Sequence, residues 1–258
     1  MVIEKNYAFG NTVFRIQSPI PLPCNEQLES FVVPADTPAD HTFRAVAADE
    51  AALAEMSPDD LYLVRRAGNE TTVSMKDVSL LSDFSLSLLL AKARAYDILL
   101  ERDALVLHAS FVARDGKALL FSAPSGTGKS TQAHLWKAER QCEIINEDRV
   151  ILFKDKGNFY ATGCWAMGSA GYTGSTVLPV DTLVLLTQGE ENAVSPLRPS
   201  ELLRRTIPQC AFTSSDPASR GRVIGLLCDL AASVRTISYA CINHPSSVEH
   251  LEKVLWKK

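Results

Sequence analysis

The sequence of 258 residues lacks the features that mark several classes of protein. No apolar run approaches the ~20 residues that a membrane-spanning helix needs. The first residues, MVIEKNYAFG, lack the charged-then-apolar pattern of a secretory leader. We therefore expect a globular, cytoplasmic protein without a membrane partner. Because 46% of the residues are hydrophobic, the chain can bury a real core, as one large domain or as a core with a smaller module.

Basic clusters and cysteine motifs are also missing. The formal net charge is −4, and no basic run is longer than a pair, so we expect no nucleic acid partner. The six cysteines are scattered, with no C-x-x-C and no Cys/His cluster at zinc spacing. They are predicted to be reduced thiols that mostly pack in the interior.

The composition of the chain changes near Asp83. Residues 1–82 are rich in proline and β-type residues, and Leu61–Met75 alternates around a central glycine as a hairpin does. We predict a small β-rich N-terminal module there, without a convincing chemical motif. Residues 83–258 are predicted to form a second domain. A long buried helix over 84–102 opens it, because this segment has apolar residues at helical spacing and neither glycine nor proline.

The stretch Lys117–Asp148 organises the second domain. An apolar run at 118–122 leads into the turn Ala-Pro-Ser-Gly-Thr-Gly-Lys-Ser at 123–130, and a helical segment begins at Thr131. A glycine-containing loop between a strand and a helix directs its backbone N–H groups and the helix N-terminus at an anion. This context favours a phosphate-binding loop over an ordinary glycine-rich turn.

The loop meets the strict phosphate-loop pattern only in relaxed form, because Ala123 stands at the first glycine position. Gly126 and Gly128 remain, and they let the backbone approach oxygen atoms closely. We expect Lys129 to reach the β- and γ-phosphates of ATP, and Ser130 to offer its hydroxyl to Mg²⁺. The predicted nucleotide-binding residues are Ser125, Gly126, Thr127, Gly128, Lys129, Ser130 and Thr131.

Two acids and a histidine complete the predicted site. After the helix, the apolar run CEII leads to Glu147 and Asp148, the pattern of a carboxylate at a strand end that holds Mg²⁺ or orients the nucleophile. Only one helix separates Ser130 from these acids, so the two strands are predicted neighbours. His108 lies in the apolar run 104–113, beside the strand that feeds the loop. For this histidine a packing role and a catalytic role are both open.

Weaker signals surround these residues. The segment 163–175 is rich in small residues, and a mobile loop or an irregular surface connection explains it equally well. Trp165 within it is interpreted as a packing residue. His134 and Trp136, on the helix after the loop, are also interpreted as packing or helix-face residues, since nothing at helical spacing pairs with them chemically.

The remaining segments are predicted as ordinary elements of the domain. We expect a strand over 181–187, a helix that begins at 200–205, an exposed loop at 213–220 and a helix over 223–232. The adjacent Arg204 and Arg205 are expected to point in different directions and to meet solvent. One of them assisting phosphoryl transfer is the alternative.

The segments LHASFV, LLFSAPSGTGKST and INEDRVIL together resemble the HPr kinase/phosphorylase family. They are most similar to its shorter HPr-kinase-related members, whose core is also similar to that of ATP-dependent phosphoenolpyruvate carboxykinase. The resemblance runs from about Phe84 to the C-terminus and is dense between Leu107 and Leu152. It implies an α/β fold in which a P-loop kinase core, with a mixed β-sheet and flanking helices, follows the β-rich N-terminal module.

The resemblance also implies roles for residues. The family's phosphate loop falls on Ala123–Ser130, its strand histidine on His108, and its acidic pair on Glu147 and Asp148. In HPr kinases this pair is Asp-Asp, with one member as base toward the acceptor serine and the other interacting with Mg²⁺. Glu147 departs from that pattern, and we expect Asp148 to be indispensable. The implied catalytic residues are Asp148, Glu147, His108 and Lys129, and the implied Mg²⁺ ligands are Ser130 and Asp148.

The leading hypothesis is a Mg²⁺/ATP-dependent kinase that transfers the γ-phosphoryl group to a hydroxyl. A serine of a small protein or peptide is the favoured acceptor, because the proteins that this sequence resembles are associated with phosphorylation of ribosomally made peptides. Two alternatives stay open at this point. One is a small-molecule kinase on the same core, and the other is a nucleotide-binding accessory protein that has lost catalysis.

Overall fold

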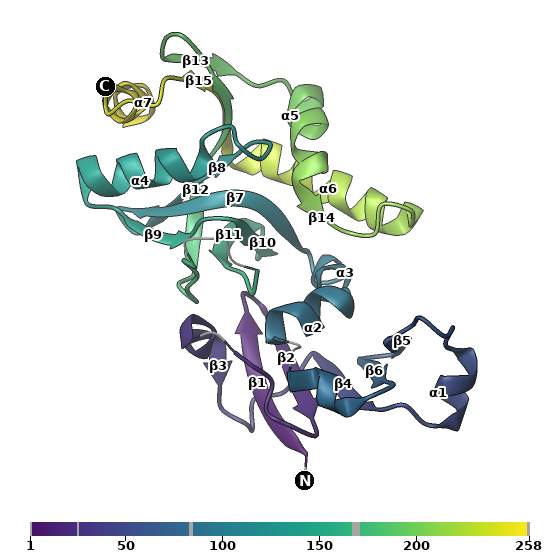
Figure 1. Cartoon of the computed structure of the whole chain (residues 1–258). Coiled ribbons are helices and arrows are strands. Elements are labelled where there is room, and N and C mark those ends of the chain that lie inside the picture. Colours follow the sequence, from purple (N-terminus) through teal and green to yellow (C-terminus); the bar gives the residue numbers. More distant parts are fainter. Residues whose placement is uncertain (1, 25, 83–84, 167–170, 257–258) are drawn as a thin grey trace. The chain divides into compact units, whose positions relative to one another are not determined.

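The computed structural model of the chain describes residues 2–24, 26–82, 85–166 and 171–256 (Figure 1). It has a mixed α/β fold with two compact units, Met1–Ile98 and Leu99–Lys258. Each unit contains its own mixed β-sheet, and each is described separately below. No helix within the described residues is both long and apolar enough to cross a membrane.

The first unit is built on a six-stranded sheet in the order β3-β1-β2-β4-β6-β5. Aromatic side chains of β1, β2 and β4 pack together in its core, with Phe9, Phe14 and Phe43 fully buried. The predicted hairpin is confirmed, because β5 and β6 pair antiparallel around Gly68, which has a φ of 55°. The strands are β1 (Ile3–Phe9), β2 (Thr12–Ser18), β3 (Val32–Val33), β4 (His41–Ala47), β5 (Tyr62–Ala67) and β6 (Glu70–Met75). The helices and 3₁₀ turns are η1 (Glu26–Phe31), α1 (Glu50–Glu55), η2 (Val78–Ser82) and α2 (Leu86–Lys92).

The single long helix predicted over 84–102 is wrong. Two short helices occupy the segment, α2 and α3 (Ala95–Leu100), and residue 84 lies outside the described residues. Arg94 separates them with a left-handed φ of 56°, and its Nε donates a hydrogen bond of 2.8 Å to Asp97. The local ion pair therefore stabilises a break that the apolar periodicity does not reveal.

The second unit is built on a nine-stranded mixed sheet with helices on both faces, which confirms that part of the predicted architecture. The main strand order is β11-β10-β7-β8-β12-β15-β13, and an additional pairing of β11 with β12 closes a ring of strands. The strands are β7 (Ala104–Arg114), β8 (Lys117–Ser122), β9 (Glu143–Asn146), β10 (Arg149–Asp155), β11 (Asn158–Gly163), β12 (Leu178–Gln188), β13 (Ala193–Pro196), β14 (Cys210–Ala211) and β15 (Arg235–Cys241). The helices are α4 (Lys129–Arg140), α5 (Pro199–Thr206), the 3₁₀ turn η3 (Ile207–Gln209), α6 (Pro217–Ser233) and α7 (Ser246–Trp256).

The two faces of this sheet bury separate apolar clusters. On β8, Leu120 packs with residues of α5 and α6, whereas Leu119 and Phe121 pack with residues of α4 and α7. This alternation follows from the period of two residues along a strand. Because β8, β12 and β15 run parallel, their carboxyl ends meet at one edge of the sheet. That edge carries the residues considered below.

Helix α6 begins earlier than predicted. The segment 213–220 was expected to be an exposed loop, yet the helix starts at Pro217. Asp216 caps it by accepting hydrogen bonds from the backbone N–H groups of Ala218 and Ser219, at 3.2 and 2.9 Å. An aspartate cap before a proline at the first helical position is a favourable helix start.

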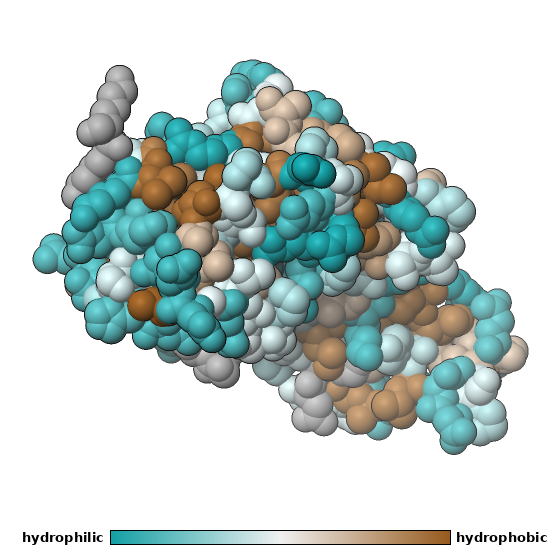
Figure 2. All heavy atoms as spheres, turned by 90° about the horizontal axis from the view of Figure 1, so that it is seen from above, coloured by the Kyte–Doolittle hydropathy of each residue, from teal (hydrophilic) through white to brown (hydrophobic). Residues whose placement is uncertain are grey.

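The surface of the molecule is mixed in polarity. Figure 2 shows separate hydrophobic areas among hydrophilic ones on the face that it draws. The large hydrophobic side chains that stay exposed within the described residues come from distant parts of the chain, namely Val2, Val32, Leu53, Leu61, Val177, Ile224 and Val254. Such scattered exposure is normal for a globular protein.

A charged and aromatic cluster fastens α4 and α7 to β7. The Arg114 guanidinium lies 3.8 Å from the ring centroid of Trp256 and 5.4 Å from that of Trp136. Arg114 and Arg140 both donate hydrogen bonds of 3.1 Å to Oε1 of Glu252, and Arg140 adds a bond of 3.0 Å to Oε2. The Glu252 side chain is only 10% exposed, so its charge depends on these two partners.

We predict that Glu252→Gln lowers the free energy of unfolding of the second unit by about 2 kcal/mol, because two partly buried guanidinium groups lose their shared carboxylate. Urea unfolding followed by tryptophan fluorescence measures this unit, since all three tryptophans lie in it. Glu249→Gln on the same helix is the matched control. It removes an exposed pair with Lys253 and should cost less than about 0.5 kcal/mol. Equal effects of the two substitutions would contradict the role of the cluster.

Candidate active site

The loop between β8 and α4 has the backbone conformation that its glycines allow. Gly126 and Gly128 have φ values of 78° and 112°, in the region that residues with a Cβ rarely adopt. A Cβ at Gly128 would also lie 3.3 Å from Oδ1 of Asn243. Gly128 is the N-cap of α4 and provides no side-chain hydrogen bond to it. The first N–H groups of α4 therefore have no side-chain cap.

Lys129 is held beneath this loop. Its side chain is buried, and its Nζ donates hydrogen bonds to the carbonyl oxygens of Ala123, at 2.9 Å, and Pro124, at 3.3 Å. Burial lowers the pKa of the Lys129 ammonium, and the nearby Asp148 carboxylate opposes that shift. The lysine is thus fixed in place by the first two residues of the loop.

A cavity of about 330 Å³ brings most of the predicted site residues together. The predicted residues that line it are His108, Ser125, Gly126, Gly128, Lys129, Ser130, Thr131, Glu147 and Asp148. Thr127 lies instead on the wall of a neighbouring, larger cavity. Asn243, which follows β15, also lines the smaller cavity and was not predicted.

Asp148 and His108 contact each other in this cavity. Nε2 of His108 lies 3.2 Å from Oδ1 of Asp148, and its Nδ1 lies 3.1 Å from Oε1 of Gln209. The hydrogen bond from His108, together with the charges of Arg149 and Lys129, lowers the pKa of the Asp148 carboxyl against the opposing effect of burial. Asp148 is therefore ionised at neutral pH and well suited to hold a cation.

Glu147 has a different environment from its neighbour. Its side chain is only 5% exposed, and its Oε1 lies 2.6 Å from Nε2 of His134 on α4. His134 was expected to be a packing or helix-face residue, because only partners on its own helix were considered. The sequence did contain a signal that His134 lies near the site: it follows Ser130 by four residues, and residues at this spacing lie on the same face of a helix.

The turn that presents the two acids is fixed by side chains of neighbouring strands. Oδ1 of Asn146 accepts hydrogen bonds from the backbone N–H groups of Asp148 and Arg149, at 2.9 and 3.0 Å. The Ser110 hydroxyl donates a bond of 2.9 Å to the carbonyl oxygen of Glu147. Asn146 and Ser110 are both fully buried, and sequence reasoning missed the role of each.

The segment predicted as a mobile loop or surface connection, 163–175, is described only in part, since residues 167–170 lie outside the described residues. Trp165 is buried, which confirms its packing role. The Thr173 hydroxyl accepts a bond of 3.1 Å from Nδ2 of Asn146 and donates one of 2.8 Å to the carbonyl oxygen of Cys164. This segment therefore supports the turn that carries the acids.

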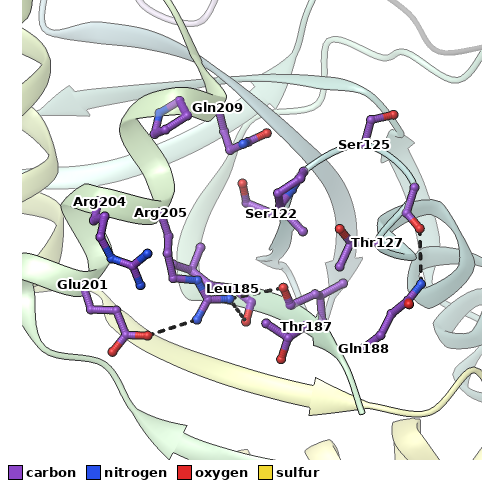
Figure 3. A pocket seen from close by; sticks show the side chains of 15 residues that line it. Ser122, Ser125, Thr127, Leu185, Thr187, Gln188, Glu201, Arg204, Arg205 and Gln209 are labelled. Carbon is purple, nitrogen blue, oxygen red and sulfur yellow. Dashed lines mark hydrogen bonds and ion pairs between the residues drawn. The ribbon is translucent and has the colours of Figure 1, made fainter.

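A larger cavity of about 810 Å³ lies on another side of the loop, and the end of β12 and helix α5 complete its wall (Figure 3). Arg205 is bound to this wall: it donates hydrogen bonds to the carbonyl oxygens of Leu185 and Leu186, at 3.1 and 3.2 Å, and to the Ser238 hydroxyl at 2.7 Å. Both arginines were predicted to meet solvent. This prediction is confirmed for Arg204, which is exposed, and is wrong for Arg205.

Among solved structures, the "Hpr(Ser) kinase/phosphatase from Coxiella burnetii" is similar, with 16% sequence identity over 58% of this chain and 94% of that chain, and a TM-score of 0.34. The curated proteins contain no match. A family model described as "SynChlorMet cassette protein ScmC" matches residues 76–207, which include the loop, His108 and both acids. Because this match spans half of the chain, the protein belongs to the ScmC family of SynChlorMet cassette proteins.

Proposed function

We propose that this protein is a Mg²⁺/ATP-dependent kinase that transfers the γ-phosphoryl group of ATP to a hydroxyl, with a serine of a peptide or small protein as the favoured acceptor. One observation carries the proposal. The cavity of about 330 Å³ is shared by Lys129 and Ser130, at the start of α4, and by the carboxylates Glu147 and Asp148. A phosphate cradle and two acids in one space are what phosphoryl transfer requires.

The loop and α4 would bind the triphosphate. The uncapped N-terminus of this 12-residue helix offers N–H groups and the positive end of the helix dipole. Lys129 contributes a positive charge whose position is fixed by the carbonyl oxygens of Ala123 and Pro124. Both features bind phosphate groups, and neither selects the base or the sugar of the nucleotide.

The residues of the cavity also fit a magnesium ion. The described residues contain no group of three or more His, Cys, Asp or Glu side chains that could hold a metal by themselves. Mg²⁺ in kinases is held by one or two carboxylates together with phosphate oxygens and water, so Asp148 and the Ser130 hydroxyl would suffice. The ion would neutralise charge on the phosphates, and the lowered pKa of Asp148 keeps its carboxylate ionised for this role.

In the transfer step, the acceptor oxygen forms a bond to the γ-phosphorus while the bond from that phosphorus to the β,γ-bridging oxygen breaks, and ADP leaves. The hydroxyl proton goes to a carboxylate. We assign this role to Glu147, because a carboxylate with a lowered pKa, such as Asp148, is a weak base. Nε2 of His134 lies 2.6 Å from Oε1 of Glu147, and the His134 side chain is 49% exposed, so a proton passed to His134 would reach solvent.

We predict that Lys129→Gln weakens Mg²⁺·ATP binding at least about tenfold, because a fixed positive charge beside the phosphates is lost. Titration with a fluorescent ATP analogue measures the affinity. Lys137→Gln is the matched control, since Lys137 lies on the same helix, outside the cavity, and donates a bond to the Tyr172 hydroxyl. Thermal melting without nucleotide checks that both variants fold. An unchanged affinity in Lys129→Gln would refute the phosphate-binding role of the loop.

We predict that Asp148→Asn and Glu147→Gln both abolish labelling of an acceptor from γ-labelled ATP, but for different reasons. Asp148→Asn should also remove the effect of Mg²⁺ on nucleotide affinity, whereas Glu147→Gln should leave it intact. Incubation with a serine peptide pool, with Asp155→Asn at the exposed end of β10 as control, measures the transfer.

Three results of this experiment separate the hypotheses. A labelled acceptor that persists in both Asp148→Asn and Glu147→Gln would contradict the assignment of the acids. Labelling of small molecules in place of peptides would identify a small-molecule kinase. ATP binding that depends on Lys129, without transfer to any acceptor, would identify an accessory protein.

A further inference from the structure

The larger cavity adjoins the smaller one at the loop. Ser125 and Gly126 line both cavities. Gln209 lines only the larger cavity, yet its Oε1 lies 3.1 Å from Nδ1 of His108, which lines the smaller one beside Asp148. Thr131, further along α4, lines only the smaller cavity. The larger cavity thus approaches the smaller one at the end that carries His108 and the acids.

The charges around the larger cavity do not balance. Its wall contains Arg204, Arg205 and Glu201 from α5. Oε1 of Glu201 lies 3.3 Å from Nη1 of Arg205, and Nη2 of Arg205 donates hydrogen bonds to the carbonyl oxygens of Leu185 and Leu186 on β12. Arg204 has no hydrogen bond or ion pair with any residue that the structure describes, and Figure 3 accordingly draws no interaction for it. The cavity therefore keeps one positive charge available.

The rest of the wall is suited to a small organic group. Pro208 provides apolar surface, and Thr187 and Gln188 add a hydroxyl and an amide at the end of β12. A volume of about 810 Å³ lies within the usual range for ligand pockets, and a short stretch of peptide fits it as well as a small molecule does.

We propose that the larger cavity binds the phosphoryl acceptor, and that this acceptor carries a carboxylate that pairs with Arg204. The inference rests on the proposed function, because it requires the triphosphate to occupy the smaller cavity. The acceptor hydroxyl then passes Gln209 from the larger cavity into the smaller one. It reaches Glu147 and Asp148 at the end of the smaller cavity that lies away from Thr131. Arginine is the side chain best matched to a carboxylate, since its planar guanidinium donates two parallel hydrogen bonds.

The test measures binding and does not depend on turnover. The probes are two fluorescent peptides, each with one serine, flanked by glutamates in the first and by glutamines in the second. They are titrated into the protein saturated with Mg²⁺·ADP. The variant is Arg204→Gln, whose exposed position makes misfolding a minor concern. Arg198→Gln is the matched control, because Arg198 is exposed at the start of the same helix and does not line the cavity.

We expect the wild-type protein to bind the glutamate peptide roughly tenfold more tightly than the glutamine peptide. Arg204→Gln should lose this preference and keep its Mg²⁺·ATP affinity within about twofold, while Arg198→Gln should behave as the wild type.

Two results would overturn the inference. If Arg204→Gln weakens Mg²⁺·ATP binding as strongly as Lys129→Gln does, the larger cavity holds the nucleoside. If the wild-type protein binds both peptides equally, or binds neither, no acceptor carboxylate is recognised there. Failure of the proposed function gives a separate result, in which the preference for the glutamate peptide depends on Arg204 but no phosphoryl group is transferred.

Discussion

Strand β7 is the constraint on which the site depends, because it changes partners on both of its edges at the same point. On one edge it pairs with β10 up to His108 and with β9 from Phe111 onward. The turn with Glu147 and Asp148 fills the interval, held by the N–H of Ala109 and the hydroxyl of Ser110. On its other edge β7 pairs with β14 before His108 and with β8 after it. A shift of β7 by one residue would turn His108 to the opposite face of the sheet and separate it from the acids.

This arrangement gives two adjacent acids different properties. Asp148 lies beside His108, Arg149 and Lys129, and the resulting electrostatic stabilisation of its charge exceeds the cost of partial burial. Glu147, one residue earlier, is more deeply buried and contacts His134 from α4. A pair of acids in unlike environments suits a division of labour between binding a cation and accepting a proton. Compared with an aspartate, Glu147 has one more methylene group, and its longer side chain lies in the buried environment beside His134.

Sequence patterns were sufficient for features that depend on neighbouring residues. The strand before the loop and the helix after it follow from local composition, and the structure has both. The contacts of His134 and Gln209 were missed because each partner is set by tertiary structure. The role of Asn146 was missed although its Oδ1 binds N–H groups only two and three residues ahead. The long helix predicted over 84–102 is wrong for a different, local reason, because apolar periodicity continues across Arg94 while the helical φ does not.

The relaxed loop pattern also has a structural explanation, which depends on where the left-handed conformations occur. Ala123 does not have a positive φ, so its Cβ carries no backbone strain, and the residue packs in the apolar cluster that includes Phe121 and Trp136. Its carbonyl oxygen accepts the hydrogen bond from Lys129 and needs no glycine for this purpose. The loop requires glycine only at Gly126 and Gly128, where the φ values are positive. An alanine at the first position is therefore compatible with the loop, because it replaces a glycine where this backbone does not require one.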